Sequence, residues 1–307
     1  MQEDVTGWAI VVHGGAGAGS ELNDGCLAAA QAAQRELDNG AALGAAVAAV
    51  VSMENDGRFN AGTGAVLGLD GSTIEMDACV MDSRGRLGSV ALLRGVRNPV
   101  LVARDVSTTP HCLLGGEGAE RFARLMGHAD YREVSAKARK AHADMIAKLK
   151  SAEPAMPGEK NADFAAFWNY ARSPEFIKGR PSDTVGAVVR DRDGHFAVAG
   201  STGGSAPSLL GRIGDTPLPG CGFFAGEHGA VAATGVGEYM IRTMLASRVY
   251  HWIADGVPLL EALQRGVGLM PKEVEAGLIA VSRTEAGAWS NADMPHTVLD
   301  HKLKKGK

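Results

Sequence analysis

The stretch Asp183-Thr184-Val185-Gly186-Ala187-Val188-Val189 is the most informative part of this 307-residue chain. A threonine opens an apolar, β-branched run directly after a charged, proline-containing segment, which predicts the start of a buried strand. Inside a chain, a threonine hydroxyl has no adjacent base and is a poor nucleophile. If the Asp183–Thr184 bond were cut, the freed α-amine of Thr184, with a pKa of about 7.7–8.0, could serve as the general base. The stretch therefore suggests an amidohydrolase that activates itself.

Threonine is common at the start of strands, so this step alone is weak support for a nucleophile. Three later segments rich in glycine give it a context: residues 201–204, 211–215 and 234–238. Each of them taken singly has an ordinary explanation, either as a turn or, for Arg212 and Asp215, as an exposed ion pair that contributes little. Their order and spacing after Thr184 together favour a catalytic site.

The composition is that of a globular protein with a sizeable core, since 45% of the residues are hydrophobic and the formal net charge is −4. This charge does not favour nucleic-acid binding, and the one cationic run, residues 302–307, is expected to be a solvated tail. No run of about eighteen strongly apolar residues predicts a membrane span. The acidic start, Met1-Gln2-Glu3-Asp4, is not a secretory signal, although a processed signal could have preceded it.

The four cysteines lie far apart and form no C-x-x-C pair. We interpret Cys26, Cys79, Cys112 and Cys221 as reduced thiols in or near the core of a cytoplasmic protein.

Several common active-site motifs are missing from the sequence. The loop His13-Gly14-Gly15-Ala16-Gly17-Ala18-Gly19 follows a predicted strand, but it fails the G-x-G-x-x-G template because Ser20 takes the third glycine position. There is no G-x-x-x-x-G-K-[ST] phosphate loop, no G-x-S-x-G serine elbow and no H-x-H or H-E-x-x-H metal motif. Nucleotide binding, serine hydrolysis and a catalytic metal are therefore disfavoured, and His13, His195 and His228 are expected to be structural or exposed.

Hydrophobic patterns predict alternating blocks of strands and helices. Strands are expected over residues 8–12, 88–93, 184–190, 195–200, 230–233, 277–282 and 288–290, with a hairpin across residues 191–194. Residues 59–82 are expected to form a turn followed by short strands, with a hairpin around Asp70-Gly71. Helices are expected over residues 23–39, 42–53, 99–105, 115–126, 133–150, 238–254 and 258–269. Blocks rather than strict β-α-β units favour an α+β layered fold. We interpret the proline-containing residues 151–183 as a processing segment inside one domain spanning residues 1–307, although a domain linker is the alternative.

Together these segments resemble the plant-type L-asparaginase/isoaspartyl peptidase family of N-terminal nucleophile hydrolases. The resemblance covers nearly all of the chain up to about residue 282, and the number of ordered motifs makes it specific. The matching segments are VVHGGAG (11–17), FNAGTGAV (59–66), EMDACVMD (75–82), RNPV (97–100), GEGA (116–119), TVGAV (184–188), STGG (201–204), GRIGD (211–215) and TGVGE (234–238).

The resemblance implies a four-layer αββα sandwich made as one precursor. This precursor would cut itself between Asp183 and Thr184 into residues 1–183 and 184–307, and the two subunits would stay together. It further implies a dimer of such cleaved units and no cofactor for catalysis. Family members often bind a structural sodium ion through backbone carbonyls of the loop before Asn60, which here corresponds to Met53 to Phe59.

Carried over residue by residue, the resemblance also implies roles for the reacting groups. Thr184 matches the nucleophile and, through its freed amine, the base. Thr202 matches a threonine that assists both self-cleavage and catalysis, and Asn60 matches an asparagine close to the nucleophile. Thr234 and Gly235 match the pair that stabilises the tetrahedral oxyanion.

The resemblance implies that Arg212 and Asp215 hold the substrate's α-carboxylate and α-amine, with Gly237 as a further glycine of the substrate site. The physical chemistry agrees, because a zwitterionic head group needs one fixed cation and one fixed anion close together. Arg212 can bind a carboxylate through two parallel hydrogen bonds, and Asp215 can accept from an ammonium group.

The expected activity is hydrolysis of β-aspartyl (isoaspartyl) dipeptides and of the side-chain amide of L-asparagine. A glycosylasparaginase and an uncleaved, catalytically silent binding or scaffold protein are the alternatives. Glycosylasparaginases carry a tryptophan-containing segment after the first strand, where this chain has His13-Gly14-Gly15, so that branch ranks lower. Residues 286–300 follow the family pattern only loosely, and residues 206–210 have a composition of their own that could alter substrate choice.

Overall fold

The strands form two sheets in the computed structural model, which describes residues 7–38, 40–149, 169–170 and 184–301. The larger sheet has seven strands in the order β11-β1-β5-β6-β2-β3-β4, and the smaller has four in the order β10-β9-β8-β7. All neighbours are antiparallel except the pair β3–β4. The strands are β1 (Ala9–His13), β2 (Met76–Asp82), β3 (Leu87–Leu93), β4 (Leu113–Gly115), β5 (Val185–Arg190), β6 (Phe196–Thr202), β7 (Phe223–Gly226), β8 (Gly229–Gly235), β9 (Ala276–Ser282), β10 (Ala286–Ser290) and β11 (His296–Asp300).

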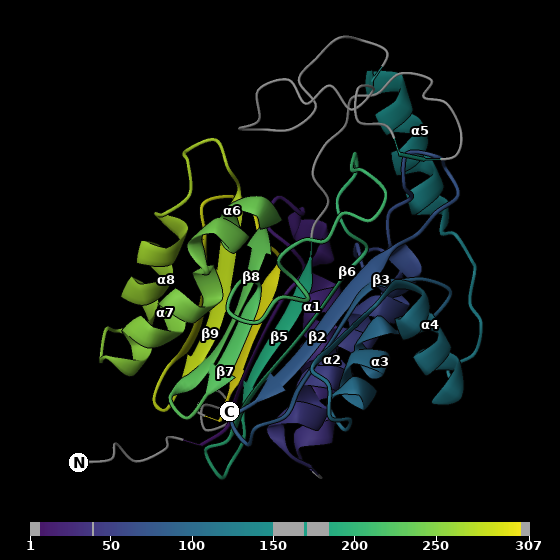
Figure 1. The fold of residues 1–307 in the computed structure, drawn as a ribbon. Helices are drawn as coiled ribbons and strands as arrows, with labels where there is room; N and C mark the ends of the chain where they lie inside the picture. Colours follow the sequence, from purple (N-terminus) through teal and green to yellow (C-terminus); the bar gives the residue numbers. More distant parts are fainter. Residues whose placement is uncertain (1–6, 39, 150–168, 171–183, 302–307) are drawn as a thin grey trace.

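Helices pack on the outer faces of the two sheets (Figure 1). Those beside the larger sheet are α1 (Asn23–Leu37), α2 (Ala42–Asp56) and α3 (Pro99–Val106), with α4 (Gly116–Leu125) and α5 (Ala136–Leu149) further along the chain. Those beside the smaller sheet are α6 (Gly237–Thr243), α7 (Leu245–Ala254) and α8 (Leu259–Val267). Two short 3-10 helices, η1 (Ser20–Leu22) and η2 (Gly62–Gly64), precede α1 and follow α2.

The buried apolar side chains fall into three clusters that correspond to these contacts. One lies between the larger sheet and α1–α3, and another between the smaller sheet and the helices α6–α8. The third lies between the sheets and includes Val11, Val188 and Val198 from the larger sheet and Ala232 and Ile279 from the smaller. This arrangement confirms the α+β class that the sequence predicted.

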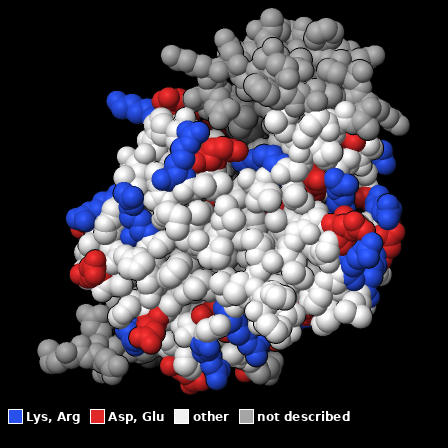
Figure 2. All heavy atoms as spheres, in the orientation of Figure 1, with Lys and Arg blue, Asp and Glu red and all other residues white. Residues whose placement is uncertain are grey.

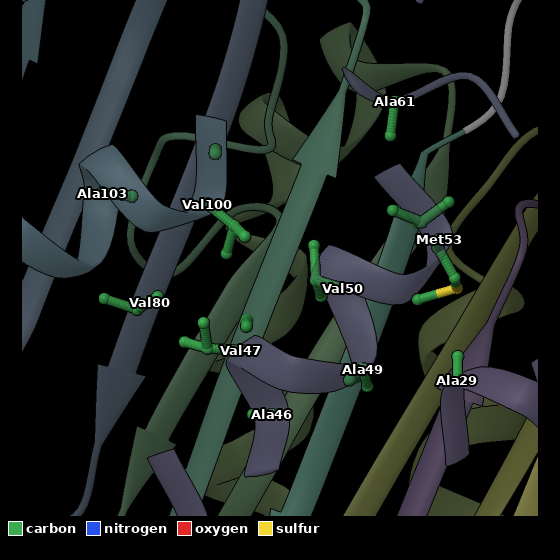
Figure 3. Close-up of a cluster of buried hydrophobic side chains, with 14 of the residues drawn as sticks. Ala29, Ala46, Val47, Ala49, Val50, Met53, Ala61, Val80, Val100 and Ala103 are labelled. Atoms are coloured by element: carbon green, nitrogen blue, oxygen red, sulfur yellow. The ribbon is translucent and has the colours of Figure 1, made fainter. Parts of the chain in front are cut away.

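Small side chains on α2 let this helix approach the larger sheet closely. Ala46, Ala49 and Val50 are fully buried, and Val47 nearly so, on the face of the helix toward the strands (Figure 3). Alanine loses no side-chain entropy in a helix, so an alanine-rich helix can serve as a core element at little conformational cost. The expectation of a core helix here is confirmed.

The predicted hairpin around Asp70-Gly71 is wrong. The Asp70 carboxylate accepts hydrogen bonds from the amides of Ser72 and Thr73, which closes a local turn without strands on either side. The first hairpin of the chain instead joins β2 to β3 across residues 83–86, where Asp82 accepts from the amides of Arg84 and Arg86. Both aspartates close a turn by accepting hydrogen bonds from backbone amides. The two turns differ in that only the one after Asp82 is flanked by paired strands.

Three strands were not expected from the sequence: β4, β7 and β11. Residues 288–290 therefore do not close the chain, because β11 follows and pairs with β1, with Val298 opposite Val11. The predicted helix over residues 238–254 is broken into α6 and α7 at Met244, which has a φ of 50°. The proposed processing segment, residues 151–183, lies outside the described residues apart from Asn169 and Tyr170.

The cysteines are free thiols, of which Cys26, Cys79 and Cys221 are buried and Cys112 is exposed, so Cys112 does not belong to the core. None of the described helices is both long and apolar enough to cross a membrane. Figure 2 shows one face of the molecule, on which basic and acidic side chains alternate around a broad area with few charges.

Candidate active site

Thr184 immediately precedes β5, an interior strand of the larger sheet. β5 pairs with β6 so that Val185 is opposite Ser201, and continuing this register by one residue places Thr184 beside Thr202. Side chains alternate along a strand, so Thr184 shares a face with Gly186 and Val188, the face toward the smaller sheet. Thr184 is buried there, while Asp183 lies outside the described residues.

The absence of a side chain at Gly186 lets the two sheets approach closely beside Thr184. A Cβ at this position would lie 2.4 Å from Nε2 of His13 and 3.3 Å from Cβ of Ala232 in β8. His13 itself is fully buried, and burial, with a smaller effect of His296, lowers its pKa to about 3, so its ring is neutral. A cavity of about 10 Å³ lies between the sheets, lined among others by Thr184, His13 and Thr216. Thr184 therefore opens onto the space between the sheets.

Asn60 holds the turn that follows Thr202. The Asn60 side-chain amide donates to the carbonyl of Gly204 (2.8 Å) and accepts from the amide of Val66 (3.0 Å). Its backbone carbonyl accepts from the amide of Gly203 (3.0 Å), and the Thr202 hydroxyl accepts from the amide of Gly204 (3.1 Å). Asn60 thus fixes the turn after Thr202 by hydrogen bonds to the backbone of Gly203 and Gly204.

Thr234 and Gly235 end β8 in the smaller sheet. The fully buried Thr234 hydroxyl accepts a hydrogen bond from the amide of Ala16 (3.2 Å), so its own hydrogen is available to another acceptor. Gly235 has a φ of +138°, and a Cβ there would lie 2.4 Å from the carbonyl oxygen of Glu275, so this position requires glycine. The glycine-rich turn after β1 is therefore fixed directly to the end of β8.

Arg212 and Asp215 meet at Gly237. A Cβ on Gly237 would lie 2.7 Å from Oδ1 of Asp215 and 3.0 Å from Nη2 of Arg212, so only glycine leaves room for both side chains. Arg212 is not the exposed residue of a surface ion pair, because its side chain is only 17% exposed. The family resemblance assigned these three residues to one substrate site, and they lie side by side in the structure.

Glu238, for which no role was expected, binds Arg212 directly. Nε and Nη2 of Arg212 donate to the two oxygens of Glu238, each at 2.9 Å. Burial lowers the pKa of Arg212, but Glu238 together with Asp215 and Asp77 raises it overall, so the guanidinium stays charged. Glu238 stands next to Gly237 in the first turn of α6, and its place in the motif of residues 234–238 was the only sequence signal for it.

Asp215 is a buried carboxyl with an incomplete set of partners. Its Oδ2 has no hydrogen-bond partner among the described residues, and burial raises its pKa to about 7, against the opposing effect of Arg212. A buried polar oxygen without a donor is costly, so this oxygen is suited to accept from a cation that enters the site. An ammonium group beside Asp215 and a carboxylate beside Arg212 would satisfy both charges.

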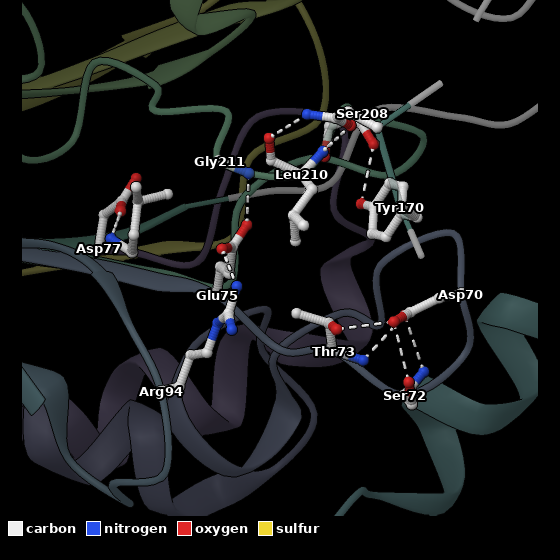
Figure 4. Close-up of polar contacts among 12 residues, drawn as sticks. Asp70, Ser72, Thr73, Glu75, Asp77, Arg94, Tyr170, Ser208, Leu210 and Gly211 are labelled. Carbon is white, nitrogen blue, oxygen red and sulfur yellow. Dashed lines mark hydrogen bonds and ion pairs between the residues drawn. The ribbon is translucent and has the colours of Figure 1, made fainter. Parts of the chain in front are cut away.

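The loop before Arg212 is fixed by residues that are distant in sequence (Figure 4). The Tyr170 hydroxyl donates to the carbonyl of Ser208 (3.0 Å), and Asn169 and Leu210 exchange two hydrogen bonds (2.9 and 3.0 Å). These contacts involve the loop whose composition departs from the family pattern.

The candidate ligands for a cation in residues 53–59 are backbone oxygens, because the side chains of Glu54 and Asp56 already accept hydrogen bonds from Asn98 and Arg58. The carbonyl oxygens of Gly57 and Phe59 both face Gly64, where a Cβ would lie 2.7 and 1.9 Å from them. The carbonyl of Arg58 accepts a hydrogen bond from the ammonium of Lys137. Carbonyl oxygens are suitable ligands for a hard cation. Within the described residues, no group of three or more His, Cys, Asp or Glu side chains could hold a metal.

Comparison with known proteins agrees with this arrangement. The sequence profile of the asparaginase family matches residues 6–301, so the chain belongs to that family. It is 38% identical over 278 residues to a plant-type L-asparaginase of Pyrococcus abyssi, covering 86% of this chain and 85% of the relative. It is 35% identical over 314 residues to an isoaspartyl peptidase/L-asparaginase of Mus musculus, covering 97% of this chain and 90% of the relative.

The raised pKa of Asp215 predicts that Asp215→Asn stabilises the protein at alkaline pH. Because the folded-state pKa is about 7 against an ordinary value of 3.8, wild-type stability falls as pH rises from about 4 to 7 and stays low above it. The variant lacks this penalty, so its Tm should exceed that of the wild type at pH 8, and the difference should shrink toward pH 4. Thermal unfolding at the two pH values measures this.

Asp70→Asn is a control for which the expected change in Tm at pH 8 has the opposite sign. Burial raises the pKa of Asp70, but hydrogen bonds from Thr73 and Ser72 outweigh it and lower the pKa to about 2. Its carboxylate therefore stabilises the fold above about pH 4, a contribution lost as pH falls through about 2, so Asp70→Asn should lower Tm at pH 8. An Asp215→Asn variant that is also less stable than the wild type at pH 8 would contradict the assigned burial cost.

Proposed function

We propose that this protein hydrolyses β-aspartyl (isoaspartyl) dipeptides and the side-chain amide of L-asparagine. The observation that carries the proposal is the meeting of the Arg212 guanidinium, whose side chain is 17% exposed, and the buried Asp215 carboxyl at Gly237. Both substrates present a free α-amine and a free α-carboxylate, and these two charges match Asp215 and Arg212. The names of the relatives, L-asparaginase and isoaspartyl peptidase, support this choice.

The proposed reaction uses Thr184 for both nucleophile and base. Its hydroxyl oxygen attacks the β-carbonyl carbon while its free α-amine takes the hydroxyl proton. The carbon–nitrogen bond then breaks, and the amine returns the proton to the leaving nitrogen, which departs as ammonia or as the amino group of an amino acid. Water hydrolyses the β-aspartyl ester that remains on Thr184, and aspartate is released.

Two donors are proposed to stabilise the negative charge on the tetrahedral oxygen: the Thr234 hydroxyl and the amide of Gly235. The hydrogen bond from Ala16 supports this role for Thr234, because it fixes the hydroxyl oxygen while leaving its proton to donate. Loss of one such donor typically costs about 10²–10³ in rate. Thr202 and the turn held by Asn60 are proposed to assist both self-cleavage and turnover from the neighbouring strand.

The proposal includes self-cleavage of a single domain, residues 1–307, between Asp183 and Thr184. Subunits 1–183 and 184–307 would stay together, because β5 pairs with β1 on one side and β6 pairs with β2 on the other. The helix–sheet–sheet–helix contacts and the three apolar clusters support the four-layer αββα sandwich of N-terminal nucleophile hydrolases. We also propose a cytoplasmic dimer of cleaved units, no catalytic cofactor and a structural sodium ion on the carbonyls of residues 53–59.

The proposed activity predicts which amides are cleaved. The wild-type protein is expected to release ammonia from L-asparagine and the free amino acid from a β-aspartyl dipeptide, whereas Thr184→Ala should release neither. Coupled ammonia detection and amino-acid analysis measure the products. Aspartate release from a glycosylated asparagine in preference to these substrates would favour glycosylasparaginase, and no turnover of any of them would favour a silent binding or scaffold protein.

Removing the carboxylate anchor should affect the reaction strongly. Arg212→Ala is expected to lower kcat/KM for L-asparagine at least about 100-fold, because two charge-assisted hydrogen bonds are lost. The matched control is Arg242→Ala, since Arg242 lies in the same region on α6 but stacks on the ring of Tyr239. Steady-state kinetics of the two variants decide the question, and equal losses in both would place the head-group site elsewhere.

A further inference from the structure

Two acidic side chains at the start of β2 point toward the loop that carries Arg212. Met76, Ala78 and Val80 face the helices on the outer side of the larger sheet, so Asp77 lies on the opposite side with Cys79, toward the smaller sheet. Asp77 is 3% exposed and lies opposite Thr202 in the pairing of β2 with β6. Its carboxyl group is thus buried beside the strand ends that form the candidate site.

Asp77 joins two backbone segments. Its Oδ1 accepts from the amide of Leu92 (2.9 Å), where β3 is irregular and Leu92 has a φ of 55°. The amide of Gly214, one residue before Asp215, also lies near enough to lower the pKa of the Asp77 carboxyl. Burial raises the pKa of Asp77 to about 6, while these two amides and the charge of Arg212 oppose the rise. The carboxylate is therefore ionised at neutral pH, and the amide of Leu92, the charge of Arg212 and the amide of Gly214 stabilise it in that order.

Glu75 makes an equivalent contact at the other end of the same loop (Figure 4). Its Oε2 accepts from the amide of Gly211 (2.8 Å), and its Oε1 accepts from the guanidinium of Arg94 (2.6 Å). The side chain of Glu75 is only 16% exposed. One carboxylate directly before β2 and one within it therefore face the backbone on either side of Arg212: Glu75 binds the amide of Gly211, and Asp77 lies near the amide of Gly214.

The held amides fix the guanidinium itself, because Arg212 folds back over Gly214. A Cβ on Gly214 would lie 2.7 Å from Nη1 of Arg212. The charged groups around this guanidinium are the carboxylates of Glu238, Asp215 and Asp77. A shift of Gly214 would therefore displace the cation relative to Asp215 and Gly237.

We propose that Asp77 and Glu75 are positioning residues that set the place of Arg212 by binding the amides of Gly214 and Gly211. The proposal rests on the proposed function in one respect, the use of Arg212 to bind the substrate carboxylate. Neither residue reaches the reacting atoms, so their loss weakens substrate binding and leaves self-cleavage at Thr184 intact.

The test that needs no activity is amide hydrogen exchange of the full-length protein. Asp77→Asn keeps the volume of the side chain but removes its charge and replaces one acceptor oxygen with a donor. Exchange at Gly214 is expected to accelerate at least about tenfold in this variant, and exchange at Gly211 is expected to accelerate in Glu75→Gln. Unchanged exchange at both glycines would overturn the proposal.

The matched control is Asp82→Asn, at the far end of the same strand. Asp82 is 8% exposed and, like Asp77, is a buried carboxylate that binds backbone amides, those of Arg84 and Arg86 (both 2.9 Å). Its substitution should accelerate exchange in the turn of residues 83–86 and leave Gly211 and Gly214 unchanged. Acceleration at Gly214 in Asp82→Asn as well would indicate general loosening of β2 and would overturn the specific role of Asp77.

Kinetics provide the second measurement. For L-asparagine, Asp77→Asn is expected to raise KM about tenfold or more with kcat within about threefold of the wild type, and Asp82→Asn to change neither. A fall in kcat with unchanged KM would overturn the proposal. If the wild type turned over no β-aspartyl amide while exchange at Gly214 still accelerated in Asp77→Asn, the proposed function would fail and the positioning of Arg212 would stand.

Discussion

The close approach of the two sheets is the constraint on which the candidate site depends. Gly186 in the larger sheet leaves room for the buried ring of His13 and for Ala232 of the smaller sheet, and β5 and β8 pack against each other there. Thr184 and Thr202 belong to the larger sheet, whereas Thr234 belongs to the smaller one. Only the packing of the two sheets brings them together. A larger side chain at position 186 would meet the ring of His13 first and then Ala232, and would force apart the strands that carry Thr184 and Thr234.

A single cation, the guanidinium of Arg212, lies near three carboxyl groups in this site. Arg212 binds Glu238 through two hydrogen bonds and lies near Asp215 and Asp77, while Oδ2 of Asp215 lacks a partner among the described residues. A zwitterionic head group would add one carboxylate and one ammonium group, and so would change the partners of Arg212 and satisfy Asp215. Buried groups left incomplete in this way lower stability and are typical of sites that bind a charged ligand.

Local pattern was sufficient to predict the strand at Thr184, its hairpin with β6 and the core helix α2, because each depends on periodicity within one short segment. The pattern failed at Asp70, where a turn signal was not accompanied by pairing strands, and at β11, whose partner β1 lies at the opposite end of the chain. Family resemblance supplied Arg212, Asp215 and Gly237 but not Glu238 or Asp77, which bind neighbours through side chains whose directions only the folded chain determines.

The central claim is that Thr184 acts with a free α-amine that the protein generates itself. The measurement that tests it most directly is the intact mass of purified wild-type protein after incubation near pH 7.5, beside Thr184→Ala. The account predicts two chains in the wild type, with masses matching residues 1–183 and 184–307, and one uncut chain in the variant. One uncut chain in both proteins, or cleavage in Thr184→Ala at the same bond, would contradict it.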